Sequence, residues 1–215
     1  MSMVSSETGK LKARWISSAF GPFLMLADQG RLVATGWRCL GASVPEEADE
    51  DPCLNEALAQ RIQKALCGSP QQFLDLPAPQ GTAFQKACWA RARQIPAGET
   101  LSYGKLAEAI GSSGGGRAAG QAMRKNPLPI IIPCHRIISS NGALGGFSGT
   151  SAEGRPAMLI KAQLLQREQE WRTGIAADLV GFPMEPPIRS SSAYTGEFAP
   201  PPPLITGIRS LDPCD

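Results

Sequence analysis

A cysteine followed directly by a histidine is the pair in this sequence best suited to covalent chemistry. Cys134 and His135 are adjacent, and His135 is the only histidine among the 215 residues. A thiol is a nucleophile only as the thiolate, and an imidazole is the usual side chain that removes its proton. If the protein uses a histidine base, that base must be His135. The alternative is a structural cysteine beside a surface histidine.

The residues before this pair predict a short buried strand that ends at the thiol. Ile130–Ile132 is a β-branched run, and Pro133 has no N–H with which to continue a ladder. Asn126 can hold the preceding turn through its side chain. Adjacent residues of an extended chain point to opposite sides, so the cysteine and the histidine need a bend or a water between them. The glycine-rich run 141–149 can bring its backbone close to a flat ligand.

Composition limits the class of protein. Hydrophobic residues make up 42% of the chain and charged residues 19%, which is typical of a globular protein. No apolar run approaches the roughly 20 residues that span a bilayer, and the first residues lack the order of a secretory signal. We therefore expect a cytoplasmic protein without a membrane partner. The six cysteines include no C-x-x-C pair, so we expect neither disulfides nor a metal site. We expect most of the thiols to be buried.

Charge divides unevenly along the chain. Residues 81–170 contain 11 Lys and Arg against 5 Asp and Glu, whereas acidic residues outnumber basic ones on both sides. A locally basic segment suits a polyanion such as nucleic acid. Scattered solvated charge explains an excess of this size about as well.

The first part of the chain is predicted to be a scaffold. Residues 23–27 and 31–35 are expected to be strands that flank a short hairpin loop. A helix with an apolar stripe at Leu54, Leu58, Ile62 and Leu66 is expected to be capped by Asp51 and to end at Gly68. A linker at 77–81 follows, and no cluster of catalytic residue types lies before it.

The next part predicts three helices, which begin near Thr82, at Ser102 and at Arg117. The second and third helices, with the glycine-rich turn 112–116 between them, form a candidate helix-turn-helix. The third helix contains small residues between basic ones, a composition that allows close approach to DNA. Close packing of two helices requires the same small residues, so both interpretations remain open. The end of the chain is rich in Pro, Ser and Gly and predicts a flexible tail.

Several motifs together resemble the O6-alkylguanine-DNA alkyltransferase family. The similarity is strong over residues 82–149, continues through the helix 161–168, and is looser over 14–76. The connection between Gly149 and Lys161 is longer than the usual one in the family. The matching segments are Phe84–Gln85, Ser102–Tyr103, Met123–Pro127, Pro133–Arg136 and Gly145–Gly149.

The resemblance implies a fold of the α/β (α+β) class. Residues 1–80 would form an RNase H-like sheet-and-helix domain, and residues 81–173 a helical winged helix-turn-helix domain that carries the reactive cysteine. Residues 174–215 have no counterpart in the family, and their composition predicts a disordered, Pro-rich tail. The implied function is DNA repair by stoichiometric transfer of an alkyl group from O6-alkylguanine, and from O4-alkylthymine, to the cysteine. The implied protein is a monomer without a cofactor, which binds double-stranded DNA in the minor groove.

The resemblance also implies residue roles. Cys134 would accept the alkyl group, His135 would take the thiol proton through a water, and Glu168 would orient His135. Asn126 would brace the turn, and Tyr103 would donate a proton to the leaving base. The remaining expected contacts are Ser148, Phe147, Lys161 and Pro133 to the substrate, and Arg117, Ala118, Ala119, Gly120, Arg124 and Tyr103 to DNA, with Arg117 filling the space of the extruded base.

Two other functions use the same residues. A cysteine hydrolase would turn over repeatedly with Cys134 and His135, although no oxyanion-hole motif is evident. A non-catalytic module would bind alkylation damage without reacting, and the presence of the cysteine argues against it.

Overall fold

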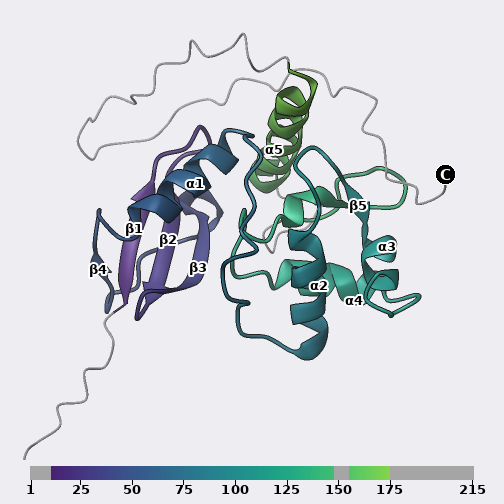
Figure 1. Ribbon diagram of the computed structural model, residues 1–215, viewed down its shortest axis with the longest axis horizontal. Coiled ribbons are helices and arrows are strands. Elements are labelled where there is room, and N and C mark those ends of the chain that lie inside the picture. The colour runs from purple at the N-terminus through teal and green to yellow at the C-terminus, as the bar shows by residue number, and fades with distance from the viewer. Residues whose placement is uncertain (1–10, 148–154, 175–215) are drawn as a thin grey trace, which may run out of the picture.

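The computed structural model describes residues 11–147 and 155–174. A four-stranded sheet with one helix forms one side of the molecule, and a group of helices with a second, two-stranded sheet forms the other (Figure 1). The expected mixture of helices and strands is confirmed. Ser148 and the Pro-rich tail after residue 174 lie outside the described residues.

The larger sheet confirms the predicted hairpin. It consists of β1 (Lys12–Ile16), β2 (Phe23–Asp28), β3 (Arg31–Trp37) and the short β4 (Asp49–Glu50), in the order β3-β2-β1-β4. β1 pairs antiparallel with β2 and parallel with β4, and β3 pairs antiparallel with β2. β3 is therefore an edge strand, whose outer side faces the rest of the molecule.

Helix α1 (Glu56–Leu66) lies against this sheet, and its start corrects one prediction. The cap is Asn55, whose side chain accepts a hydrogen bond from the backbone N–H of Leu58. Asp51 instead accepts from the N–H of Cys53 in the turn before the helix. The helix therefore begins later than the apolar stripe suggests, because residues 52–55 form a turn.

The second side contains the three predicted helices. Thr82 and Gln85 form a capping box at the start of α2 (Ala83–Arg93), and Ser102 caps α3 (Tyr103–Glu108). Helix α4 (Gly116–Arg124) packs against both of them. The small parallel sheet pairs β5 (Leu101–Ser102) with β6 (Ile137–Ile138). β5 thus places α3 directly beside the segment that follows the reactive cysteine.

The predicted strand at Ile130–Ile132 is wrong. Ile130 has a φ of +74°, a left-handed conformation that is an outlier for a β-branched residue. The chain folds back on itself there, with one isolated bridge between Pro129 and Ile132. A short 3-10 helix, η2 (Cys134–Arg136), follows at once. The apolar run is buried as expected, but as part of a tight turn.

Helix α5 (Arg155–Thr173) begins six residues before the expected start at Lys161. Much of the long connection is therefore the first turns of this helix. One face of α5 is buried at a spacing of three and four residues, and it includes Lys161 and Glu168. The helix contacts η2 and also η1 (Arg38–Leu40), which follows β3. It therefore connects the two sides of the molecule.

A single cluster of buried side chains runs through both sides and includes Trp37 of β3 and Cys134. The predicted boundary near residue 80 remains a prediction. The five cysteines within the described residues are free thiols, and Cys39, Cys53 and Cys67 are exposed, so the expectation that most thiols are buried is wrong. Among the helices of the described part, none combines the length and apolar character that a membrane span requires.

Candidate active site

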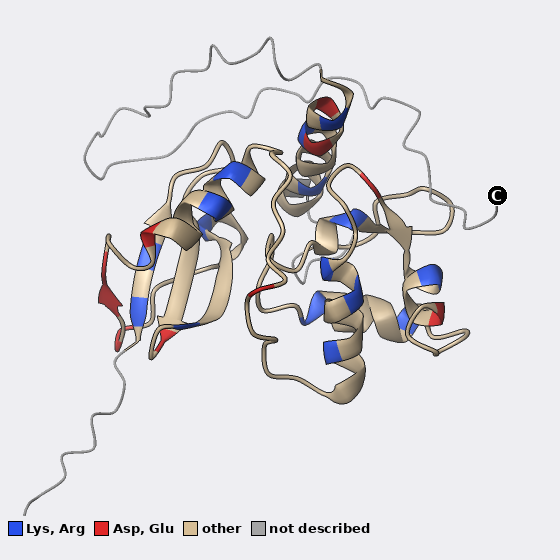
Figure 2. Cartoon of the chain, in the orientation of Figure 1, with Lys and Arg blue, Asp and Glu red and all other residues tan. Residues whose placement is uncertain are grey.

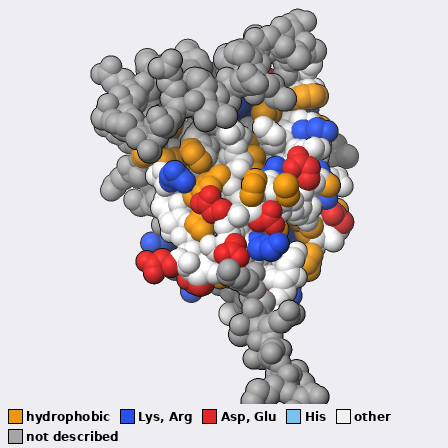
Figure 3. All heavy atoms as spheres, turned by 90° about the vertical axis from the view of Figure 1, so that its left-hand side faces the viewer, with side chains coloured by type: hydrophobic (Ala, Val, Ile, Leu, Met, Phe, Trp, Pro, Cys, Tyr) orange, Lys and Arg blue, Asp and Glu red, His pale blue; other side chains and the backbone are white. Residues whose placement is uncertain are grey.

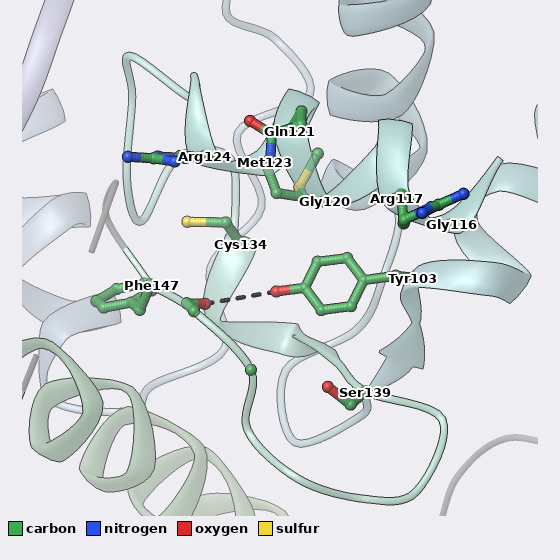
Figure 4. A pocket seen from close by; sticks show the side chains of 12 residues that line it. Tyr103, Gly116, Arg117, Gly120, Gln121, Met123, Arg124, Cys134, Ser139 and Phe147 are labelled. Carbon is green, nitrogen blue, oxygen red and sulfur yellow. Dashed lines mark hydrogen bonds between the residues drawn. The ribbon is translucent and has the colours of Figure 1, made fainter. Parts of the chain in front are cut away.

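The reactive cysteine faces a pocket of about 360 Å³. Cys134 is 4% exposed overall, and its sulfur points into this space in Figure 4. The pocket lies between α3, α4, η2 and the described part of the glycine-rich loop, residues 141–147. Its walls are formed by Tyr103, Gly116, Arg117, Gly120, Gln121, Met123, Arg124, Ser139, Gly145, Gly146 and Phe147. The fold thus brings together six predicted site residues from separate segments of the chain: Tyr103, Arg117, Gly120, Arg124, Cys134 and Phe147.

The 3-10 helix η2 provides the bend that the cysteine and histidine require. The N–H of Cys134 donates to the carbonyl of Ile132 at 2.7 Å, and the N–H of Arg136 donates to that of Pro133 at 2.9 Å. Successive side chains of a 3-10 helix lie about a third of a turn apart. Cys134 therefore reaches the pocket while His135 points toward α5. Pro133 itself is buried and does not line the pocket.

Glu168 lies within hydrogen-bond distance of the histidine, the residue that it is predicted to orient. Its Oε1 lies 2.9 Å from Nε2 of His135, and both side chains are buried. The same carboxylate accepts from Nη2 of Arg136 at 2.7 Å and from the N–H of Gly98 at 3.0 Å. The sequence analysis gave no role to Arg136, although it stands in the quoted motif. Its guanidinium neutralises a carboxylate that would otherwise be costly to bury.

The electrostatics of this group suit a neutral base. Burial by itself raises the pKa of Glu168, but His135 and Arg136 outweigh it and lower the pKa to about 2. Burial lowers the pKa of His135 despite the opposing effect of Glu168, so the ring is neutral at pH 7. An ionised Glu168 accepts a hydrogen bond from the Nε2–H of His135, so that Nδ1 keeps its lone pair. Nδ1 has no hydrogen-bond partner within the described residues.

The depressed pKa of Glu168 predicts a loss of stability in acid. A folded-state pKa of about 2, against 4.5 for the free side chain, stabilises the fold above about pH 4.5 by about 3 kcal/mol. This contribution is lost as the pH falls from about 4.5 toward 2. Urea unfolding at neutral pH and near pH 3 measures it, and the difference should shrink in Glu168→Gln.

Asp75 provides a matched control for this prediction. Its pKa is also lowered to about 2, by a hydrogen bond from Arg61, but its side chain is 57% exposed. A surface pair contributes little to stability, so Asp75→Asn should leave the acid dependence almost unchanged. An equal effect of the two variants would contradict the role of the buried carboxylate.

The thiol needs a base because burial raises the pKa of Cys134. The side chain of Asn126 and the charge of Lys161 oppose this rise without cancelling it. Asn126 also makes two hydrogen bonds within the turn before the cysteine: its Nδ2 donates to the carbonyl of Ile132, and its Oδ1 accepts from the N–H of Leu128, both at 2.9 Å. At neutral pH the cysteine is therefore mostly a thiol until its proton is removed.

Tyr103 lies across the pocket from Cys134 and keeps its proton. Burial, together with the nearby thiol, raises the pKa of Tyr103 to about 12. Its hydroxyl donates to the carbonyl of Gly146 at 3.4 Å, a weak bond that a better acceptor could replace (Figure 4). Gly145 permits this close approach, because a Cβ there would lie 3.1 Å from the ring. Tyr103 is thus a proton donor at neutral pH.

Lys161 does not face the pocket, in contrast to its predicted role in substrate contact. It is fully buried, and its Nζ donates to the carbonyls of Ile137 and Leu144 at 2.5 Å and of Gly146 at 3.3 Å. Burial lowers the pKa of Lys161 to about 8. Because these carbonyls belong to β6 and the glycine-rich loop, Lys161 fixes the pocket wall from behind.

Helix α4 presents only some of its predicted DNA-contact residues. Arg117, Ala118 and Arg124 are exposed, and Gly120 is half-buried beside the Tyr103 ring. Ala119 is fully buried in the core, so the prediction that it contacts DNA is wrong. Its small side chain serves the packing of α4 against the neighbouring helices.

The fold is mixed α/β, and it places a buried cysteine at a pocket, next to a histidine that is paired with a glutamate. These features define the class: a protein with a reactive-cysteine site beside a helical surface. Residues 83–170 match the family described as "6-O-methylguanine DNA methyltransferase, DNA binding domain". The constitutive methylated-DNA--protein-cysteine methyltransferase of Bacillus subtilis is 44% identical over 124 residues, which are 57% of this chain and 70% of that protein. The enzyme of the same name from Methanosarcina acetivorans is 35% identical over 133 residues, 61% of this chain and 85% of that one.

The solved structures agree with the sequence comparison. A crystal structure of Mycobacterium tuberculosis OGT in complex with DNA superposes with a TM-score of 0.64 at 31% identity, and covers 74% of this chain and 94% of that one. The O6-methylguanine-DNA methyltransferase of Pyrococcus kodakaraensis, at 20% identity and a TM-score of 0.52, shares the fold. The chain belongs to the methylated-DNA--protein-cysteine methyltransferase family.

Proposed function

We propose that the protein repairs DNA by transferring an alkyl group from O6-alkylguanine, and from O4-alkylthymine, to the sulfur of Cys134. The observation that carries this proposal is the position of Cys134. The sulfur lies at a pocket large enough for a flat base, with the His135–Glu168 pair directly behind it. The relatives named above are methyltransferases that act on methylated DNA, according to their names.

The reaction moves one alkyl group and one proton. Nδ1 of His135 draws the proton from the thiol through a water, and Glu168 stabilises the resulting imidazolium. The thiolate attacks the alkyl carbon, so that the S–C bond forms as the C–O bond of the base breaks. Tyr103 donates a proton to a ring nitrogen of the leaving base and regains one from His135. Phe147 forms the apolar pocket wall, and Ser148 contacts the oxygen of the lesion.

The product explains why the protein acts once. A thioester can be hydrolysed through its carbonyl, but an alkyl thioether offers water no such carbon. The alkylated Cys134 therefore persists, and one molecule repairs one lesion. No cofactor enters this scheme.

The helical side is the surface for double-stranded DNA. Basic side chains recur on α2 and α4 with few acidic ones among them (Figure 2), whereas both signs are interspersed on the side of the molecule where the larger sheet lies (Figure 3). Residues 81–173 act as a monomeric winged helix-turn-helix domain in which α4 enters the minor groove. Its exposed Ala118 and half-buried Gly120 allow close approach, and Arg124 reaches a phosphate. Residues 1–80 form the RNase H-like scaffold.

Mass spectrometry tests this function directly. After incubation with a duplex that carries one O6-methylguanine, we expect one methyl group per protein, on the peptide that contains Cys134. An unmodified duplex is the control. Repeated turnover would indicate a hydrolase, and binding without an adduct would indicate a damage-binding module; either result would contradict the proposal.

Arg117→Ala is expected to separate base extrusion from chemistry. Arg117 is exposed at the start of α4 and lines the pocket, where it fills the space that the base leaves. The rate on duplex DNA should fall about 10- to 100-fold, because extrusion costs a few kcal/mol. The rate with free O6-alkylguanine base should change little. Lys64→Ala, on the exposed side of α1, controls for the loss of one charge, and equal losses on both substrates would contradict this role.

A further inference from the structure

The edge strand β3 contacts the turn that carries the reactive cysteine. The N–H of Thr35 donates to the carbonyl of Pro127 at 3.0 Å. The hydroxyl of the same residue donates to the carbonyl of Pro129 at 2.9 Å. Thr35 is 8% exposed, and Pro129 is buried as well. One residue of the larger sheet therefore supplies two hydrogen bonds to a segment more than 90 positions away in sequence.

The turn requires outside support because of its composition and conformation. Pro127 and Pro129 have no N–H, so each offers the backbone only a carbonyl, and a buried carbonyl without a donor is costly. Between Pro129 and the cysteine, Ile130 holds its φ of +74°. A β-branched residue keeps such a conformation only where its surroundings enforce it. Thr35 acts at the residue directly before this strained position.

A short series of hydrogen bonds connects Thr35 to the thiol. The Pro127–Pro129 segment that Thr35 holds also contains Leu128, whose carbonyl accepts from the N–H of Ile132 at 2.8 Å. The carbonyl of Ile132 in turn accepts from Asn126 and from the N–H of Cys134. The position of the thiol relative to Asn126 and His135 therefore depends on the geometry of this turn.

The same strand also contacts one wall of the pocket. Trp37, two residues after Thr35 in β3, packs against the Phe147 ring with a centroid distance of 5.8 Å. Both residues belong to the buried core. The turn before the cysteine and the Phe147 wall of the pocket therefore both contact β3.

We propose that Thr35 is a positioning residue for alkyl transfer, which holds the Asn126–Ile132 turn from β3 so that Cys134 faces its base and the pocket. This inference rests on the proposed function and assigns part of it to the larger sheet. Without the hydroxyl, the carbonyl of Pro129 loses its donor and the turn relaxes around Ile130. In the intact site the side chain of Asn126 lowers the pKa of Cys134. When the turn relaxes, the sulfur moves away from that side chain and this effect is lost.

Thr35→Val tests the proposal, because it removes the hydroxyl and keeps the size and the backbone N–H. The single-turnover rate of methyl transfer should fall about five- to tenfold. The same fold-change is expected with duplex DNA and with free O6-alkylguanine, since the defect lies in the chemistry. The apparent pKa of Cys134, from the pH dependence of its peptide-resolved reaction with iodoacetamide, should rise.

Thr35→Ser and Thr100→Val are the matched controls. The first retains the hydroxyl and should restore the rate. The second removes a buried threonine hydroxyl that has no hydrogen-bond partner within the described residues and should leave the rate unchanged. If Thr35→Val does not fold, Thr35→Ala and Thr35→Ser are compared instead.

Three results would overturn the inference: an unchanged rate and thiol pKa in Thr35→Val, a loss confined to duplex DNA, or an equal loss in Thr100→Val. Failure of the proposed function is distinguishable, because the wild-type protein itself would then give no adduct on Cys134.

Discussion

Replacement of Cys134 by serine is expected to abolish alkyl transfer, with no adduct above the background of the buffer. A serine hydroxyl has a far higher pKa than a thiol and is a much weaker nucleophile toward saturated carbon, so the neutral His135 cannot activate it. The measurement is the intact mass after incubation with the O6-methylguanine duplex. Binding of the same duplex should persist, because Cys134 is 4% exposed and the proposed DNA surface is on α4.

The other cysteines provide the control for this variant. Cys53 is exposed and free, and Cys53→Ser should react like the wild-type protein. Cys88 is a buried free thiol, and burial raises its pKa as it does that of Cys134. It therefore serves as a buried cysteine without a neighbouring histidine. A methyl adduct on Cys53 or Cys88 in the Cys134→Ser protein would show that the acceptor has been assigned to the wrong sulfur.

Glu168→Gln is expected to have the second largest effect, a loss of about 100- to 10,000-fold in the rate of transfer. A glutamine that donates its amide proton to Nε2 leaves Nδ1 protonated, and the ring can then no longer act as a base toward Cys134. The charge that stabilises the imidazolium is lost as well. The measurement is single-turnover transfer as a function of pH.

This substitution also leaves Arg136 without its carboxylate, so folding must be checked by circular dichroism and urea unfolding. Glu170→Gln is the control on the same helix, because Glu170 is half-buried and accepts a hydrogen bond from the side chain of Gln166. It should retain the wild-type rate. A folded Glu168→Gln protein with the wild-type rate would exclude the His135–Glu168 pair from the mechanism.

Parts of this site could be predicted from local sequence alone. Cys134 and His135 are adjacent, so their proximity needs no tertiary information, and a single histidine leaves one candidate base. The predicted helix starts near Thr82 and at Ser102 rest on local signals and were confirmed. The seven-residue spacing of Lys161 and Glu168 places both on one helix face, because seven residues make about two turns.

Other features depended on contacts between distant residues. The role of Arg136 arises only when α5 brings Glu168 beside it, and Lys161 faces carbonyls instead of substrate because of where β6 and the loop lie. The left-handed Ile130 contradicts the strand that its β-branched neighbours predict, since packing outweighs local propensity there. Ala119 has the composition of a surface for DNA, yet α4 turns it into the core.

The sequence by itself determined the reactive pair, the starts of α2 and α3, and the family. Only the tertiary structure decided how the thiol is held: by a turn that β3 supports, a carboxylate that Arg136 neutralises and a pocket wall that Lys161 fixes. The physical reason is that periodicity and capping act within a few residues of the chain. Burial, pKa and hydrogen bonding at Cys134 depend on groups that only the complete fold brings together.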